Sequence, residues 1–164
     1  MIGSRRTFLK GIAALPVAAS GFGFRAMAQT SGAASAAVPA PPILFVHGNG
    51  DHAPLWMTTM WRMESNGIPH DRMFAINFTD PLARSDDAVA QEFRSSTADQ
   101  RRELGEAIKA LKERTGAARV ALVGNSRGGN SIRSYIKNGG GGDVSHAVLC
   151  GVPNHGVFTW DGGL

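Results

Sequence analysis

Short runs of consecutive apolar residues alternate along the chain with longer segments whose apolar residues recur every three or four positions. Continuous or alternating apolar runs, typical of strands, lie at residues 43–46, 74–78, 120–123 and 144–150. Helical spacing covers residues 54–66, 97–116 and 128–138. Strands that alternate with helices predict an α/β fold, with a mainly parallel sheet and helices on both of its faces.

The predicted helices carry further expectations. Thr97 and Gln100 match a capping box at the start of the second helix. Inward-facing positions are expected at Leu104, Ala107, Ile108 and Leu111, and in the third helix at Ile132, Tyr135 and Ile136. In the first helix, the helical spacing favours core packing over an acyl-binding pocket for Trp56, Met57, Met60 and Trp61.

A long polar segment separates the second strand from the second helix. Residues 79–96 show no clear periodicity and exceed the usual length of a connection, which indicates a functional loop. Its Arg84, Asp86 and Asp87 could face a substrate, although a solvated surface is the simpler interpretation.

The first 28 residues have the composition of a signal peptide. Arg5 and Arg6 precede Phe8-Leu9-Lys10, an apolar Ala/Gly-rich run follows, and Ala26-Met27-Ala28 offers a cleavage site. This pattern resembles the twin-arginine export signal, which implies export by the twin-arginine translocase to the periplasm or beyond. The apolar run is too short for a stable membrane span. The expected organisation is therefore a signal peptide at 1–28, a flexible lead-in at 29–42 and a folded α/β domain from residue 43 to residue 164.

The charge of +4 resides in this N-terminal segment. The segment holds four basic and no acidic side chains, so the remainder is formally neutral and no nucleic-acid partner is expected. Cys150 is the only cysteine, which excludes an internal disulfide, and its apolar neighbours predict a buried core position. No cluster has metal-ligand spacing, and neither a metal nor a cofactor is expected.

The segment Gly124-Asn125-Ser126-Arg127-Gly128 carries the clearest chemical signal. It fits G-x-S-x-G and lies between a predicted strand and a predicted helix. In that position a serine sits on a tight turn that lifts its hydroxyl above the sheet, and the two glycines leave room for the turn. The N–H groups at the start of the helix favour developing negative charge nearby. The pattern predicts that Ser126 is a nucleophile.

A second segment, His47-Gly48-Asn49-Gly50, directly follows the first strand. Together with the G-x-S-x-G segment and with Pro153-Asn154-His155-Gly156, it resembles bacterial lipases of the α/β-hydrolase family, over residues 43 to about 156. The resemblance implies a serine ester hydrolase whose oxyanion hole is formed by the backbone N–H groups of Asn49 and Arg127. His47 is expected to be structural. The expected substrate is a small-molecule or lipid ester, without further definition.

The other members of a catalytic triad are harder to place. In this fold an acid and then a histidine follow the nucleophile, on loops after later strands. After Ser126 the sequence offers His155 and Asp161 as candidates, while His146 falls within the last predicted strand as a packed or edge residue. His155 comes earlier than a triad histidine should, so the sequence is expected to be truncated, with residues 43–164 as the N-terminal part of an α/β-hydrolase domain.

Two alternatives remain open. Residues 48–53 also match G-x-G-x-x-A, and Asp80 follows the next strand, as in a dinucleotide-binding oxidoreductase. That interpretation leaves the segment around Ser126 unexplained. The other alternative is a non-catalytic exported protein on a hydrolase scaffold.

Overall fold

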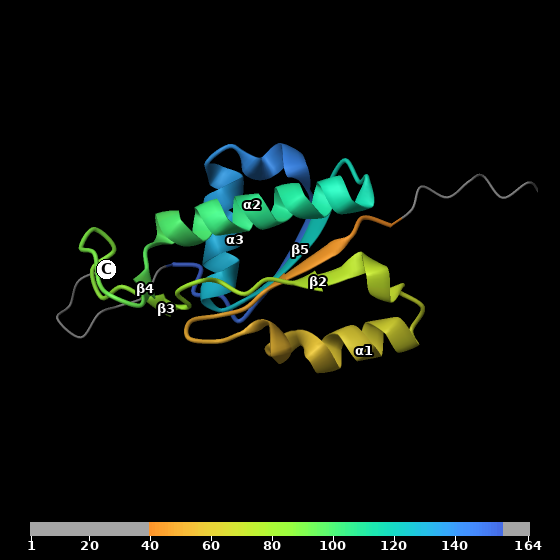
Figure 1. The fold of residues 1–164 in the computed structure, drawn as a ribbon, viewed down its shortest axis with the longest axis horizontal. Coiled ribbons are helices and arrows are strands. Elements are labelled where there is room, and N and C mark those ends of the chain that lie inside the picture. The colour runs from red at the N-terminus through yellow and green to blue at the C-terminus, as the bar shows by residue number, and fades with distance from the viewer. Residues whose placement is uncertain (1–39, 156–164) are drawn as a thin grey trace, which may run out of the picture. The chain divides into compact units, whose positions relative to one another are not determined.

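The computed structural model describes residues 40–155, and a four-stranded parallel sheet forms its centre (Figure 1). The spatial order is β2-β1-β5-β6, so that the first strand in sequence lies inside the sheet. The strands are β1 Ile43–Val46, β2 Met73–Ala75, β5 Val120–Asn125 and β6 Val144–Cys150. Their carboxyl ends meet at one edge of the sheet, where open α/β sheets bind ligands.

Helices cover both faces of the sheet, as predicted. Helix α1 Met57–Ser65 follows a 3₁₀ turn, η1 Ala53–Trp56, on one face, and α2 Thr97–Thr115 and α3 Arg127–Lys137 pack on the other (Figure 1). Two shorter 3₁₀ turns, η2 His70–Arg72 and η3 Gly140–Asp143, lead into β2 and β6. None of the helices within residues 40–155 is both long and apolar enough to cross a membrane.

Alternate residues of β1 supply two separate cores. Leu44 and Val46 face α2 and α3 in a cluster that includes Leu104 and Ile132, whereas Phe45 packs against Trp56 on the α1 side. Strands buried on both faces read as continuous apolar runs, which explains the sequence of β1. The fold prediction is confirmed.

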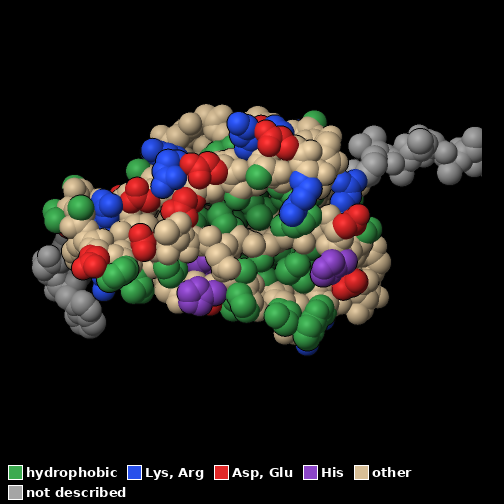
Figure 2. All heavy atoms as spheres, in the orientation of Figure 1, with side chains coloured by type: hydrophobic (Ala, Val, Ile, Leu, Met, Phe, Trp, Pro, Cys, Tyr) green, Lys and Arg blue, Asp and Glu red, His purple; other side chains and the backbone are tan. Residues whose placement is uncertain are grey.

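The second strand is shorter than the alternation at 74–78 predicted. Beyond Ala75 the chain makes one further hydrogen bond to β1, from Ile76 N–H to the Phe45 carbonyl, and then leaves the sheet. Side chains of the β2 edge and of α2 line an open, largely apolar groove beneath α2 (Figure 2). Within residues 79–96 the chain forms a two-stranded parallel pair, β3 Leu82–Ala83 and β4 Arg94–Ser95, that pattern analysis did not predict.

The capping box of α2 lies one residue earlier than predicted. Ser96 has an extended backbone and its hydroxyl accepts from Asp99 N–H, while the Asp99 carboxylate accepts from Ser96 N–H. Gln100 is instead buried and accepts a 2.7 Å hydrogen bond from the Ser131 hydroxyl of α3. The helix ends as expected, at Gly116 in the left-handed conformation.

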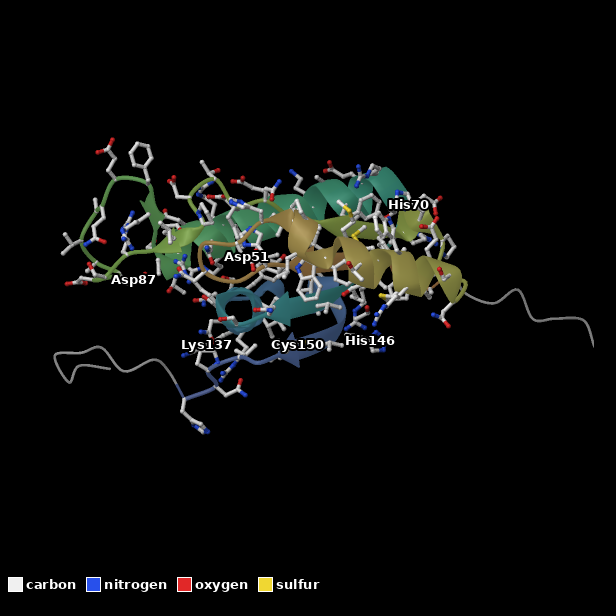
Figure 3. The ribbon with its side chains drawn as sticks, turned by 90° about the horizontal axis from the view of Figure 1, so that it is seen from below. Asp51, His70, Asp87, Lys137, His146 and Cys150 are labelled. Carbon is white, nitrogen blue, oxygen red and sulfur yellow. The ribbon has the colours of Figure 1, made fainter. Side chains whose placement is uncertain are left out.

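Several positions predicted to be buried are exposed. Cys150 is exposed because it lies on β6, the edge strand, where Val148 is 52% exposed (Figure 3). In the first helical segment Trp56 is buried and Met60 is partly buried in the core, but Met57 and Trp61 point outward. Ile136 is 37% exposed, since it lies on the outer side of α3. The position of His146 on an edge strand agrees with the sequence prediction (Figure 3).

Candidate active site

Ser126 occupies a strained turn between β5 and α3. Its backbone angles are φ 49° and ψ −124°, and among residues 40–155 the only other non-glycine residue with positive φ is Phe93. Such angles cost about 1–3 kcal/mol and persist where surrounding structure enforces them. Here the Ser126 N–H donates to the Cys150 carbonyl at 3.0 Å, and the Ser126 carbonyl accepts from Gly129 N–H at 3.1 Å. The turn is therefore fixed by both β6 and α3.

The glycines around Ser126 allow α3 to approach β1 closely. A Cβ atom on Gly128 would lie 2.4 Å from the carbonyl oxygens of both Val46 and His47. A Cβ on Gly124 would lie 2.6 Å from the Ile132 Cδ1 atom and 2.9 Å from Gly129 N. Both glycines of the G-x-S-x-G segment are thus required for packing.

The loop after β1 lies beside Ser126. A Cβ on Gly48 would be 3.1 Å from the Ser126 Cβ, which places the backbone of the next residue, Asn49, near the serine. Arg127 begins α3, so its N–H belongs to the unpaired N–H groups at the positive end of that helix. Both residues expected to supply the oxyanion donors are therefore close neighbours of Ser126: Asn49 follows Gly48, which lies against the serine, and Arg127 is the next residue in the chain.

The side chains of Asn49 and Arg127 contact residues that sequence analysis did not identify. Asn49 Oδ1 accepts from Ala83 N–H at 2.6 Å. The Arg127 guanidinium donates to the Pro81 carbonyl at 3.1 Å and to the Ser95 carbonyl at 2.6 Å. A polar loop of unusual length was the only signal in the sequence, and it did not reveal which residues the loop contacts.

His47 is a structural residue in this arrangement. Its side chain is 1% exposed, its Nδ1 donates to the Gly48 carbonyl at 2.9 Å, and its Nε2 accepts from Phe78 N–H at 3.3 Å. Burial lowers the pKa of this imidazole, which keeps it neutral with the proton on Nδ1. A neutral histidine in this tautomer fixes the start of the loop that carries Asn49.

The two candidate triad partners lie at the end of the described chain or beyond it. His155 is exposed on the loop after β6, and Asp161 lies outside the described residues. The preceding residue, Asn154, is held by Arg133, whose guanidinium donates to the Asn154 carbonyl at 2.9 Å and to its side-chain oxygen at 3.1 Å.

The charged residues of the 79–96 segment have structural contacts. Arg84 pairs with Asp99 at 3.0 Å, and the Asp87 carboxylate caps Thr97 N–H at 2.7 Å. The Asp86 carboxylate accepts from Ala88 N–H within the same loop. In the part of the chain that the structure describes, no group of three or more potential metal ligands is present.

Comparison with solved structures shows the same fold. The Bacillus licheniformis lipase BlEst2 in mature form matches with a TM-score of 0.50 and 23% identity, over 71% of this chain and 42% of the lipase. Phospholipase PlaB from Legionella pneumophila matches with a TM-score of 0.50 and 19% identity, over 70% of this chain and 26% of the phospholipase. The chain therefore spans less than half the length of either protein.

Sequence comparison defines the family. No curated protein matches the chain. The family model for lipase (class 2) matches residues 40–156, which include the loop after β1, the turn at Ser126 and the segment after β6. One family thus accounts for both segments, including the one that a dinucleotide-binding protein would leave unexplained. With an α/β-hydrolase fold and this match over most of its length, the chain belongs to the class 2 lipase family.

Proposed function

We propose that the protein is an exported serine hydrolase of carboxylic esters that acts through an acyl-enzyme on Ser126. The observation that carries the proposal is the backbone of Ser126, which adopts φ 49° between β5 and α3 and lies against Gly48. A strained turn of this kind exposes a nucleophile above a parallel sheet. Membership of the class 2 lipase family supports the same chemistry.

The reaction would proceed in two halves. The Ser126 oxygen attacks the ester carbonyl carbon, its proton passes to a histidine, and the backbone N–H groups of Asn49 and Arg127 hold the resulting oxyanion. The alcohol then leaves with that proton, and water hydrolyses the acyl-enzyme to release the acid and free Ser126. Within this sequence the candidates for the base and its orienting acid are His155 and Asp161.

A fluorophosphonate probe tests the nucleophile directly, because it reacts rapidly only with an activated serine. We expect mass spectrometry to locate the adduct on Ser126 and the Ser126→Ala variant to remain unlabelled. Hydrolysis of short and long nitrophenyl esters then defines the acyl preference. The same assays on the chain extended by whatever follows Leu164 in its gene separate two cases. Labelling of only the extended protein assigns the base to a later residue, and labelling of neither supports a non-catalytic protein.

The His155→Ala variant addresses the base. If His155 accepts the serine proton, its loss should reduce labelling by about 10²-fold or more, since general base catalysis contributes 10²–10⁴-fold. Unchanged labelling in this variant would remove His155 from the mechanism.

Export is a further part of the proposal. Arg5 and Arg6 and the Ala26-Met27-Ala28 site support recognition by the twin-arginine translocase. We expect a fusion of residues 1–42 to a reporter protein to reach the periplasm, and the Arg5→Lys, Arg6→Lys double variant to stay in the cytoplasm. Periplasmic reporter in the double variant would contradict this route.

A further inference from the structure

The segment of residues 80–95, which contains β3, β4 and the loop between them, contacts both the loop after β1 and Arg127, the first residue of α3. We propose that this segment, called here the brace, fixes the relative position of the two backbone N–H groups expected to bind the oxyanion, those of Asn49 and Arg127. Arg127 is the positioning residue, because its side chain attaches the brace to α3. The catalytic consequence rests on the proposed function, whereas the mechanical coupling does not.

The brace is bonded to the loop after β1 at two points. The Gly50 N–H donates to the Pro81 carbonyl at 3.1 Å, and the Ala83 N–H donates to Asn49 Oδ1 at 2.6 Å. Gly50 has φ 69°, and a Cβ on it would lie 3.1 Å from the Leu82 side chain. The brace therefore holds both the side chain of Asn49 and the peptide N–H of the next residue, Gly50.

The brace is also bonded to the turn at Ser126, through the side chain of the next residue. One Arg127 nitrogen donates to the Pro81 carbonyl and to the Ser95 hydroxyl, each at 3.1 Å, and the other donates to the Ser95 carbonyl at 2.6 Å. The Pro81 carbonyl thus accepts hydrogen bonds from both Gly50 and Arg127. This single oxygen joins the loop after β1 to the start of α3.

Other contacts make the brace stiff enough to transmit position. Ser95 is 2% exposed, and its hydroxyl donates to the Asp80 carbonyl while it accepts from Arg127. Arg94 donates to the Ala83 carbonyl at 2.7 Å, which reinforces the β3–β4 pair. Arg84 ties the segment to Asp99 at the start of α2.

The chemistry of the contact suits arginine specifically. Within residues 40–155 the Arg127 guanidinium forms no ion pair and instead contacts neutral oxygens of Pro81 and Ser95. A planar fork with five donors can reach three such acceptors at once, whereas a lysine ammonium is a point charge on a flexible stem. Burial lowers the pKa of Arg127, which remains charged at neutral pH.

Amide hydrogen exchange tests the coupling without any requirement for catalysis. The Arg127→Met variant keeps the backbone N–H and an unbranched apolar stem but removes every guanidinium contact. We expect exchange of the Gly50 and Ala83 amides to accelerate by about tenfold or more, since opening requires fewer bonds to break. The Arg127→Lys variant should show exchange rates between those of Arg127→Met and the wild type. The control Arg102→Met, which loses surface ion pairs with Glu103 and Glu106 and no contact with the brace, should match the wild type.

The Ser95→Ala variant protects the test against misfolding of Arg127→Met. It removes one acceptor of the arginine and the hydroxyl's own bond to the Asp80 carbonyl, but it leaves the other two contacts of Arg127 in place, so it should accelerate the same two amides by a smaller factor. Faster exchange confined to the brace, with the Gly50 amide unchanged, would overturn the proposal. Unchanged exchange at both amides in Arg127→Met would also overturn it.

Steady-state kinetics on a competent ester connect the brace to catalysis. A displacement of about 1 Å at a reacting centre can cost 10²-fold in rate, so Arg127→Met should lower kcat by about 10–100-fold with little change in KM. Arg127→Lys should restore part of kcat, as a positioning role requires. Coupled exchange in a protein whose Ser126 never reacts would refute the proposed function but not the brace. If the enzyme is active and its kcat is unchanged in Arg127→Met, the proposed role of the brace is refuted.

Discussion

Replacement of Gly128 by alanine is the most direct test of how closely α3 approaches β1. The added Cβ would lie 2.4 Å from two backbone carbonyl oxygens, those of Val46 and His47, whereas ordinary contact is 3.4–4 Å. Helix and strand must therefore separate by about 1 Å, and neither neighbour is a flexible side chain that can rotate away. Overpacking of this kind costs typically about 1–3 kcal/mol. We expect Gly128→Ala to lower the free energy of unfolding by an amount at the upper end of this range, about 3 kcal/mol.

Urea unfolding, followed by the fluorescence of the tryptophans, measures this loss. The matched control is Gly142→Ala, because a Cβ there meets nothing within 4 Å and the backbone has no positive φ. It should change the free energy of unfolding by less than about 1 kcal/mol, in the stabilising direction if at all. The displaced helix should also slow fluorophosphonate labelling of Ser126. A Gly128→Ala protein within 0.5 kcal/mol of wild type would refute the close packing described here.

Three further predictions follow from individual side chains. Ser126→Gly should be about 1 kcal/mol more stable than Ser126→Ala in urea unfolding, because glycine adopts φ 49° without a Cβ clash; equal stability would contradict the strain. The pKa of His47 is lower in the folded protein than in the unfolded chain. Its neutral form therefore contributes fully to the free energy of unfolding above the unfolded pKa of about 6.5, and this contribution is lost as the pH falls below that value. The free energy of unfolding, measured between pH 8 and pH 5, should show this loss in the wild type but not in His47→Gln. Parallel pH dependences in the two proteins would exclude the contribution of His47. The Tyr135 hydroxyl donates to Asp143 at 2.8 Å, and burial with this contact raises its pKa to about 12. As the chain has one tyrosine, ultraviolet titration of the native protein should report that value, and a midpoint near 10 would refute it.

Local patterns in the sequence were sufficient to predict the fold and the position of the turn at Ser126. Strands β1 and β5 contain continuous apolar runs because they lie inside the sheet, between other strands and under helices. A G-x-S-x-G segment between a strand and a helix has few structural interpretations. The order of the strands in the sheet, and hence which strand lies at its edge, was not predictable from such local patterns. An apolar run does not reveal which strand will be outermost, so Cys150 was predicted to be buried although it is exposed.

Contacts between distant segments account for the rest of what the sequence did not reveal. The capping box was placed at Thr97 because glutamine is a common partner in that motif, yet Ser96 with Asp99 forms it. The bond between Asn49 and Ala83 joins residues in different loops and leaves no periodic signal. Such contacts depend on the assembled sheet, which brings the loops together.

The sheet order has a consequence for the sequence of events in folding. Ile43 of β1 pairs with Ala121 of β5, and most of the described chain lies between these two residues. Parallel pairing between residues so far apart must close a long loop before it gains any contact energy, which makes it slow. During synthesis β1 can pair with β2 first, but its other side has no partner until β5 has left the ribosome. The loop at Gly48 and the turn at Ser126 meet only through that late pairing, so the chemical reactivity of this serine should arise late in folding, after most of the described chain has been synthesised.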